Sequence, residues 1–325
     1  MNWLITGGCG FIGTSLIQRL LSDTPNTNIR ILDNLSVGTK EDLKKVCDYN
    51  EINRTDIKQK ADGVELIISD IKNKEACLGS CQEIDVVVHL AANTGVAPSV
   101  EDPRSDMVTN VVGIFNMLEA ARLNQVNKFV FASSGASVGL VGPPIIEDKA
   151  PKPVSPYGAS KLAGEGYCSA YYQTFGIKTT SLRFGNVYGP RSKNKNSVVA
   201  KFIKQGLRGE TLEIYGDGTQ TRDFIFIDDL IDSIILSVNA EVGGEIFQIA
   251  TNRETTVNEV ANYIVKFMNE LTGKDVHVFH GPERPGEVKR NFSDVSKAKR
   301  FLKWEAHYTL EQGLIATIKH FLEER

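Results

Sequence analysis

The segment Leu4-Ile5-Thr6-Gly7-Gly8-Cys9-Gly10-Phe11-Ile12-Gly13 decides the fold, because it places spaced glycines between an apolar strand and an apolar helix. Gly7 permits a tight turn, Gly10 lets the backbone approach a pyrophosphate, and Gly13 allows close packing of helix on strand. The backbone N–H groups at the start of such a helix face the phosphates. The segment therefore predicts a dinucleotide-binding turn; a glycine-rich turn without a ligand is the alternative.

Outward from this turn, short apolar strands alternate with helical segments through the first half of the chain. The pattern predicts strands at 3–6, 28–32, 64–68, 85–90, 128–133 and 178–184, and helices at 11–21, 108–124 and 156–175. Alternation of this kind is typical of a parallel sheet with helices on both faces. We therefore expect an α/β fold with a Rossmann-type doubly wound parallel sheet.

The second half has a different texture, with longer polar loops and more frequent glycines. Strands at 223–227 and 245–249 are expected to rejoin the sheet, and helices are expected at 198–207, 257–271 and 310–323. We expect a first domain of residues 1–186, rejoined by about 223–250, that binds the dinucleotide. Residues 187–222 and 251–325 should form a smaller C-terminal α/β domain that binds substrate.

The bulk composition excludes several classes of protein. Of 325 residues, 41% are apolar and 24% charged, and a net charge of −3 produces no field that would attract nucleic acid. No apolar run approaches the roughly 18 residues of a membrane span, and residues 1–6 are too short for a signal peptide. The five cysteines lack zinc-ligand spacing, so we expect reduced thiols, no metal and a cytoplasmic location.

Acidic and small residues follow the predicted strands at positions that suit a dinucleotide. Asp33 ends the second strand, where a carboxylate binds the adenosine ribose hydroxyls and repels a 2′-phosphate, which favours NAD over NADP. Asp70 follows the third strand and is a candidate for the adenine, although a solvent-facing aspartate is nearly as plausible there. Ala91 and Ala92 would let the backbone lie against the dinucleotide.

Tyr157 and Lys161 are spaced to share one face of a helix. A tyrosine pKa near 10 must fall by roughly 3, or about 4 kcal/mol, to give a phenolate at neutral pH. A lysine ammonium and an oxidised nicotinamide nearby would favour that ionised form. Ser134, at the carboxyl end of the strand at 128–133, can hydrogen-bond the same substrate oxygen. These residues predict proton transfer at an alcohol or sugar carbon.

Together these features resemble the extended short-chain dehydrogenase/reductase family and, within it, the nucleotide-sugar epimerases and dehydratases. The resemblance covers nearly the whole chain. Its motifs are Thr6-Gly7-Gly8-Cys9-Gly10-Phe11-Ile12-Gly13, Asp33-Asn34-Leu35, His89-Leu90-Ala91-Ala92, Asn110-Val111-Val112-Gly113, Tyr157-Gly158-Ala159-Ser160-Lys161, Arg183-Phe184-Gly185-Asn186-Val187-Tyr188-Gly189-Pro190, Gly216-Asp217-Gly218, Arg222-Asp223-Phe224 and Arg284-Pro285-Gly286-Glu287.

The resemblance implies a bound NAD cofactor, a nucleotide-sugar substrate (a UDP-sugar by expectation) and a catalytic triad of Ser134, Tyr157 and Lys161. The implied NAD contacts are Gly7, Gly10, Phe11, Ile12, Gly13, Asp33, Asn34, Asp70, Ile71, Leu90, Ala91, Ala92, Asn110, Ser133, Tyr157, Lys161, Phe184 and Val187. The implied substrate contacts are Thr94, Ser134, Asn186, Val199, Tyr215, Arg222, Arg284, Glu287 and Asn291.

Within that set, the diphosphate would be held by Asn186, Arg222 and Arg284, with Arg191 a further candidate. Arginine offers bidentate donors that match phosphate oxygens. By the same resemblance Tyr215 would stack on the base, and Glu287 would bind the nucleotide's ribose.

Two departures from the family pattern narrow the expected function. Dehydratases and decarboxylases of this family carry an acidic residue just after the catalytic Ser or Thr, whereas residues 135–139 here contain no carboxylate. Simple epimerisation is therefore favoured. Val138 stands where many relatives have a tyrosine, which leaves the sugar open.

The expected function is that of an NAD-dependent nucleotide-sugar epimerase acting at C4 of a UDP-hexose or UDP-N-acetylhexosamine. The Tyr157 phenolate would remove the hydroxyl proton while the carbon gives hydride to NAD, and the flat keto-sugar would take the hydride back on its other face. The alternatives are a dehydratase or 4-ketoreductase on the same scaffold, and a non-catalytic dinucleotide sensor, which would not need the triad.

Two further expectations concern assembly and the sugar. The family resemblance implies a homodimer built from the helix that carries Tyr157 and the helix before the catalytic strand. Ile114, Leu118, Tyr167 and Tyr171 would serve that interface or pack within the chain. Asn291 aligns where epimerases restricted to plain hexoses hold a tyrosine, so the pocket would admit a 2-acetamido group; the alternative is that Asn291 caps a loop.

Overall fold

The structure, a computed structural model, describes residues 1–53, 57, 61–283 and 288–324. It divides into two compact units. The first is made of Met1–Val141, Glu147–Arg183 and Ser233–Phe247, and the second of Gly142–Ile146, Phe184–Asp232 and Gln248–Arg325. The ligands assigned to the two domains by sequence stay a prediction, because compactness alone assigns no ligand to a unit.

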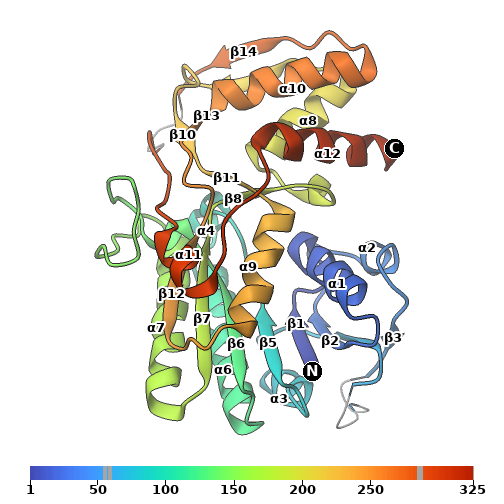
Figure 1. Cartoon of the computed structure of the whole chain (residues 1–325), viewed down its shortest axis with the longest axis vertical. Helices are drawn as coiled ribbons and strands as arrows, with labels where there is room; N and C mark the ends of the chain where they lie inside the picture. Colours follow the sequence, from blue (N-terminus) through green and yellow to red (C-terminus); the bar gives the residue numbers. More distant parts are fainter. Residues whose placement is uncertain (54–56, 58–60, 284–287, 325) are drawn as a thin grey trace. The chain divides into compact units, whose positions relative to one another are not determined.

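An eight-stranded sheet organises the first unit. Its strands are β1 (Asn2–Thr6), β2 (Asn28–Asp33), β3 (Asn50–Glu51), β4 (Val64–Ile68), β5 (Val86–His89), β6 (Lys128–Ser134), β7 (Lys178–Phe184) and β12 (Glu245–Ile249). The order β12-β7-β6-β5-β1-β2-β4-β3 runs from left to right across Figure 1. β1 pairs in parallel with both β2 and β5, and β5 with β6. The expected doubly wound α/β fold is confirmed, with its switch point between β1 and β5.

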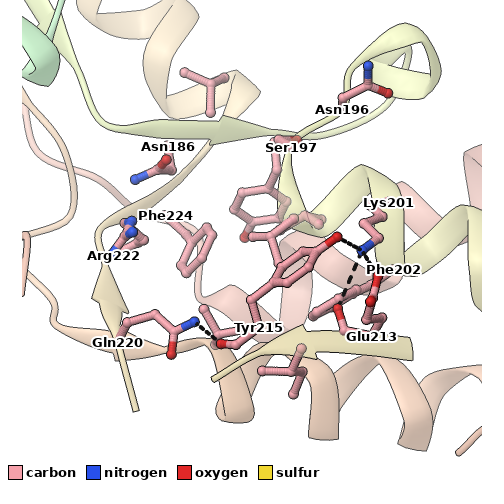
Figure 2. A pocket seen from close by; sticks show the side chains of 16 residues that line it. Asn186, Asn196, Ser197, Lys201, Phe202, Glu213, Tyr215, Gln220, Arg222 and Phe224 are labelled. Atoms are coloured by element: carbon pink, nitrogen blue, oxygen red, sulfur yellow. Dashed lines mark hydrogen bonds and ion pairs between the residues drawn. The ribbon is translucent and has the colours of Figure 1, made fainter. Parts of the chain in front are cut away.

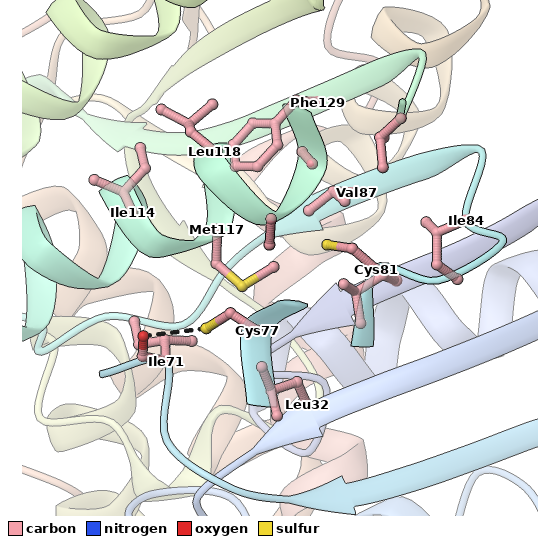
Figure 3. Packing of buried hydrophobic residues seen from close by; sticks show 14 of the residues in the cluster. Leu32, Ile71, Cys77, Cys81, Ile84, Val87, Ile114, Met117, Leu118 and Phe129 are labelled. Carbon is pink, nitrogen blue, oxygen red and sulfur yellow. Dashed lines mark hydrogen bonds between the residues drawn. The ribbon is translucent and has the colours of Figure 1, made fainter. Parts of the chain in front are cut away.

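Both faces of this sheet are buried. The helical segments of the unit are α1 (Phe11–Asp23), α2 (Lys40–Lys44), α3 (Lys74–Ser80), α4 (Val96–Glu101), α5 (Pro103–Met107), the π-helix η1 (Val108–Val112), α6 (Gly113–Leu123), the 3₁₀ turn η2 (Gly135–Ser137) and α7 (Pro156–Phe175). On one face, Met117 and Leu118 of α6 lie in one buried cluster with Cys77 of α3 and with Val87 and Phe129 of the strands (Figure 3). Alternate residues of a strand point to opposite faces of the sheet. Ile5 and Val88, whose side chains point to the other face, are buried as well.

Helix α7 shows how local sequence sets the position of a functional element. The Ser155 hydroxyl accepts a hydrogen bond from the Gly158 amide at 3.1 Å, and Pro156 occupies the first turn. The helix ends where Gly176 adopts a left-handed conformation with φ of +76°. These signals fix the bounds Pro156–Phe175, as the sequence predicted, and so fix which residues share a face.

The second unit consists of shorter elements. They are β8 (Asn186–Tyr188), the 3₁₀ turn η3 (Ser192–Asn194), α8 (Val198–Arg208), β9 (Leu212–Tyr215), β10 (Thr221–Arg222), β11 (Phe224–Phe226), β13 (Thr255–Thr256), α10 (Val257–Thr272), β14 (Val278–Gly281), α11 (Ser296–Leu302) and α12 (Leu310–Glu323). Three two-stranded sheets pair β10 with β13, β11 with β8, and β14 with β9. Helix α9 (Ile227–Asn239) contains the boundary between the units.

Three expectations need correction. The strand predicted at 223–227 does not rejoin the large sheet, because Phe224–Phe226 pairs with β8 instead. Helix α9 starts directly at Ile227, with two aspartates in its first turn that suit a helix N-terminus, at a position where the pattern predicts a strand. The helix predicted at 108–124 begins as the π-helix η1.

The candidate dimer residues fall into two groups, and the sequence leaves both roles open for each of them. Ile114, Leu118 and Tyr171 are buried in the core of the first unit, so they pack within the chain. Tyr167 is 40% exposed and contacts the ring of Phe115 edge-on at 5.8 Å between centroids.

Two features bear on the environment of the protein. The five cysteines are free thiols. Among the described residues, every helix is too short or too polar to cross a membrane.

Replacing Leu118 by alanine should lower the free energy of unfolding by about 2–5 kcal/mol, because the side chain is fully buried between α6 and the sheet. Leu123→Ala, at a 55% exposed leucine of the same helix, should change it by less than about 0.5 kcal/mol. Urea denaturation of both variants measures the difference. Equal effects would contradict the described core.

Candidate active site

The glycine turn leaves no room for side chains between β1 and α1. Gly7 has φ of +70°, and a Cβ on it would lie 2.9 Å from the Ala91 nitrogen. A Cβ on Gly13 would lie 2.5 Å from the Gly7 oxygen and from the Gly8 Cα. The Gly10 amide donates to the Gly7 carbonyl at 3.1 Å and immediately precedes the helix. The half-buried Gly7 and Gly10 therefore present backbone, without a side chain, to an approaching ligand.

The start of α1 fits a pyrophosphate. Within the described chain, no side chain caps this helix and its first turn holds no acidic residue. Amide groups of a helix's first turn lack intrahelical acceptors, and the helix dipole favours an anion at that end. The turn and the helix start therefore fit the phosphates of a dinucleotide.

Asp33 lies at the end of β2, bonded to the glycine turn. Its Oδ2 accepts from the Cys9 amide at 2.9 Å and its Oδ1 from the Leu35 amide at 2.8 Å. Burial raises the pKa of Asp33, and these two amides act in the opposite direction. Each carboxylate oxygen retains acceptor capacity for a ribose hydroxyl, whereas a 2′-phosphate would meet a like charge.

Asp70 is linked to the same loop. Its Oδ2 accepts from Asn34 Nδ2 at 2.9 Å and its Oδ1 from the Lys72 amide at 2.8 Å. Burial raises the pKa of Asp70, but these and other interactions with Lys72 and Asn34 hold it below its usual value. The Ile71 side chain lies in the core beside Cys77 (Figure 3), so its backbone is the part that could meet a cofactor.

The ends of β1 and β5 are tied together at the switch point. Thr6 Oγ1 accepts from the Ala91 amide at 3.2 Å and lies 2.8 Å from His89 Nδ1. Burial, and next the charge of Lys161, lowers the pKa of His89 to about 3, so the ring is neutral and Nδ1 can accept the Thr6 proton. These bonds fix the loop that begins with Ala91 and Ala92.

Asn110 secures the continuation of that loop. From the π-helix η1, its Oδ1 accepts from the Asn93 amide at 2.8 Å, and its Nδ2 donates to the Asn93 carbonyl at 2.9 Å and to Asp106 at 2.8 Å. Both amide protons are thus used within the protein. Asn110 therefore orients the segment that carries Ala92 and the exposed Thr94. Single-turn π-helices are frequent at functional sites.

The structure brings Ser134, Tyr157 and Lys161 together. Lys161 Nζ donates to the Ala132 carbonyl at 2.8 Å and lies 5.8 Å from the centroid of the Tyr157 ring. Ser134 Oγ accepts from the Ala136 amide at 3.2 Å and hydrogen-bonds Tyr157. Two successive turns of α7 thus face the carboxyl end of β6.

Burial shifts the pKa of both Tyr157 and Lys161. Burial raises the pKa of Tyr157 to about 12, although the hydrogen bond with Ser134 acts in the opposite direction. Burial lowers the pKa of Lys161 to about 8, and the charges of Asp106 and Glu165 raise it. The sequence suggested that Lys161 and an oxidised nicotinamide together favour the phenolate. Burial opposes the ionised form of Tyr157, so a positive charge beside the phenol would favour it.

The remaining candidate cofactor contacts are spread over both units. Phe11, Ile12 and Leu90 are partly exposed, and Ser133 is buried with its hydroxyl on Glu165. Phe184 and Val187 belong to the second unit.

The second unit contains a cavity of about 210 Å³. The predicted substrate contacts that line it are Asn186, Val199, Tyr215 and Arg222, and Val187 lines it as well. Figure 2 shows Asn186, Tyr215 and Arg222 around this cavity. The backbone N–H of Asn186 donates to the Asp223 carbonyl. Arg222 Nη1 donates to the carbonyls of Thr221 and Val288 at 2.7 and 2.8 Å.

Lys201, Glu213 and Gln220 line this cavity but were missed in the sequence. Lys201 Nζ lies 4.6 Å from the centroid of the Tyr215 ring and 3.0 Å from Glu213 Oε2 (Figure 2). Gln220 Nε2 donates to the Tyr215 carbonyl at 2.8 Å. Lys201 lies on α8, where the pattern predicted a helix, but its position relative to the candidate Val199 carried no signal. Lys201 thus contacts the Tyr215 ring, and Gln220 binds the Tyr215 backbone.

Other predicted substrate residues lie elsewhere. Arg284 and Glu287 fall outside the described residues. Asn291 is half-buried and does not line the cavity. Its backbone N–H donates to Oγ1 of Thr221, the residue before Arg222, at 3.4 Å. Arg191 has φ of +65° at the start of η3 and is half-buried.

The chain matches a family of known proteins over most of its length. The model of the "NAD dependent epimerase/dehydratase family" matches residues 3–250. The UDP-glucose 4-epimerase of Mycolicibacterium smegmatis is 36% identical over 327 residues, covering 99% of this chain and 98% of that protein.

Solved structures of other proteins match this chain over nearly its whole length. The UDP-glucose 4-epimerase of Thermotoga maritima, solved with UDP-glucose, has a TM-score of 0.87 at 34% identity and covers 100% of this chain and 99% of that one. The UDP-glucose 4-epimerase of Thermus thermophilus, solved with NAD, has a TM-score of 0.86 at 33% identity, with 99% of each chain covered.

Gly13→Ala should reduce the amount of dinucleotide that copurifies by about tenfold or more, because the new methyl group would displace the Gly7 and Gly8 backbone. Gly166→Ala is the matched control. Among the described residues, nothing beyond its own helix backbone lies within 4 Å of where this methyl group would stand, and the change should stabilise α7 by about 1 kcal/mol at most. Mass spectrometry of the released nucleotide measures the content. A full complement in Gly13→Ala would refute the proposed turn.

Proposed function

Because the chain belongs to the NAD dependent epimerase/dehydratase family, we propose that it is an NAD-dependent nucleotide-sugar epimerase, an isomerase that inverts C4 of UDP-hexoses. The observation that carries this proposal is the meeting of Ser134, Tyr157 and Lys161 in the unit that holds the glycine turn. The resemblance to UDP-glucose 4-epimerases over the full length supports the substrate class.

The chemistry divides between cofactor and side chains. The glycine turn and Asp33 would hold NAD, which would supply a hydride acceptor and donor for C4 of the sugar. Tyr157 takes the proton from the C4 hydroxyl and gives it back, while Ser134 hydrogen-bonds the same oxygen. Lys161, fixed on the Ala132 carbonyl, holds a positive charge near the phenol and favours its ionised form.

The second unit supplies the proposed nucleotide contacts. Arg222 and Asn186 suit a diphosphate, and Tyr215 presents a ring for stacking on the base. Lys201 stabilises that ring from beside it. We assign Arg284 to the diphosphate and Glu287 to the ribose on the strength of the motif alone. A firm anchor at the nucleotide retains the keto-sugar while it turns.

A dehydratase or a 4-ketoreductase is the competing function within the family. A dehydratase needs a carboxyl group beside Ser134 that can reach the sugar. The carboxylate hydrogen-bonded to Ser133 and Ser137 is Glu165, which is 1% exposed and bidentate to Arg183. A group already held in this way is unsuited to exchange protons with substrate, so epimerisation is the better assignment.

For the sugar itself, we propose that Asn291 leaves room for a 2-acetamido group. The residue adjoins Thr221, which precedes Arg222, so it lies near a proposed substrate contact. UDP-N-acetylhexosamines therefore belong among the tested substrates.

We also propose a cytoplasmic homodimer. Exposed apolar side chains on α4, α5, η1, α6 and α7 support it: Val96, Val100, Met107, Val112, Phe115 and Tyr167. The unfavourable free energy of exposing these apolar side chains to water would be offset if they packed against the same face of a second copy.

Tyr157→Phe should lower the rate of C4 epimerisation by about 10²-fold or more, because the ring stays in place but the base is lost. Ser134→Ala should cost about tenfold. NMR and mass spectrometry of products from UDP-, GDP- and dTDP-sugars, including N-acetylated ones, measure the activity.

Tyr167→Phe, at an exposed tyrosine of the same helix, is the control and should keep wild-type activity. Wild-type turnover by Tyr157→Phe would disprove the mechanism. Consumption of NAD(P)H in proportion to product would identify a reductase instead.

A further inference from the structure

Glu165 continues the face of α7 that carries the triad. Tyr157, Lys161 and Glu165 follow one another at intervals of one helical turn. Glu165 is 1% exposed, and its partner Arg183 on β7 is 2% exposed. The pair is bidentate, with Nε to Oε1 and Nη2 to Oε2 both at 2.8 Å. A buried pair of this kind carries a desolvation cost that its interaction must offset.

The carboxylate also holds both sides of Ser134. Glu165 Oε1 accepts from Ser133 Oγ at 2.5 Å and lies 2.9 Å from Ser137 Oγ. The Ser137 hydroxyl lies 2.8 Å from the Ser134 carbonyl. The short turn η2 follows Ser134 and contains only Gly135, Ala136 and Ser137, so large apolar side chains do not anchor it.

Close packing makes the position of this turn critical. A Cβ on Gly158 would lie 2.4 Å from the Ala136 oxygen, so α7 lies directly against η2. The Ala136 amide in turn donates to Ser134 Oγ. A small displacement of the turn would therefore move the Ser134 hydroxyl relative to Tyr157.

Resting on the proposed function, we propose that the Glu165–Arg183 pair is the positioning device of the triad, holding the end of β6 and the turn η2 against α7. Through Ser133 and Ser137 it sets the Ser134 hydroxyl toward Tyr157, and along β6 it sets the Ala132 carbonyl that binds Lys161. Glu165 is a positioning residue and touches no reacting atom.

The same carboxylate acts on Lys161 through its charge. Burial lowers the pKa of Lys161, while Asp106 on α5 and Glu165 and Cys168 on α7 raise it; neutral His89 on β5 and the phenol of Tyr157 also face it. Removing the charge of Glu165 lets the pKa of Lys161 fall further. Because the ammonium form is the active one, activity should then be lost at lower pH as pH rises.

The first test is Glu165→Gln, assayed for UDP-sugar epimerisation across pH. We expect kcat to fall about tenfold or more with KM within about twofold, and the alkaline limb of the profile to move down by about half a pH unit or more. Glu65→Gln is the matched control, since Glu65 forms a buried pair with Arg30 in the same unit, far from the triad in sequence. It should destabilise the protein but leave the pH profile unchanged. Unchanged profiles in both variants would overturn the proposal.

Ser137→Ala decides the matter if Glu165→Gln does not fold, because it removes one hydroxyl and no charge. We expect a kcat several-fold below wild type at an unchanged pH profile, and faster hydrogen–deuterium exchange in a peptide spanning residues 132–139. Wild-type kcat and exchange would overturn the positioning role. A wild-type protein that epimerises no UDP-sugar would refute the proposed function instead, and the exchange measurement would still test the structural link.

Discussion

The close backbone contact between α1 and the glycine turn after β1 is the constraint on which the rest of the first unit depends. Gly13 can lie against Gly7 and Gly8 only without a side chain. That contact places the start of α1 at the switch point of the sheet, where β1 and β5 end side by side. Beside this contact the Cys9 amide donates to Asp33, and at the end of the β1–β5 pairing the Ala91 amide donates to Thr6. The features that fit a dinucleotide therefore lie together at the switch point.

The catalytic end of the unit repeats this principle on a neighbouring strand. Gly158 lets α7 approach the turn after β6 as closely as Gly13 lets α1 approach β1. Polar bonds then replace apolar packing, because Ser133, Ser137 and Arg183 all converge on Glu165. Lys161 and Tyr157 lie one and two turns before Glu165 on the same face of α7, so the position of Glu165 also determines theirs. Rigid elements thus hold the reacting groups, while burial raises the pKa of the Tyr157 phenol.

The sequence could predict what depends on local signals. Ser155, Pro156 and Gly176 mark both ends of α7, and the glycine spacing marks the start of α1. It could not predict α9, because the helix follows β11 at Ile227 without an intervening turn residue. Nor could it predict the partner of β11, since strand pairing depends on residues distant in sequence. Lys201 and Glu165 escaped notice for the same reason: their importance comes from tertiary neighbours, Tyr215 and Arg183.

The central claim is that a hydride leaves C4 and returns to it without exchange with water. The direct measurement is NMR of the product formed from UDP-glucose by the wild-type protein in D₂O. The account predicts UDP-galactose in which every carbon-bound hydrogen of the sugar is retained, with deuterium confined to exchangeable hydroxyls. Deuterium at C4 or at a neighbouring carbon would show proton chemistry at carbon and contradict the account, as would the absence of any inverted sugar across the UDP-sugars tested.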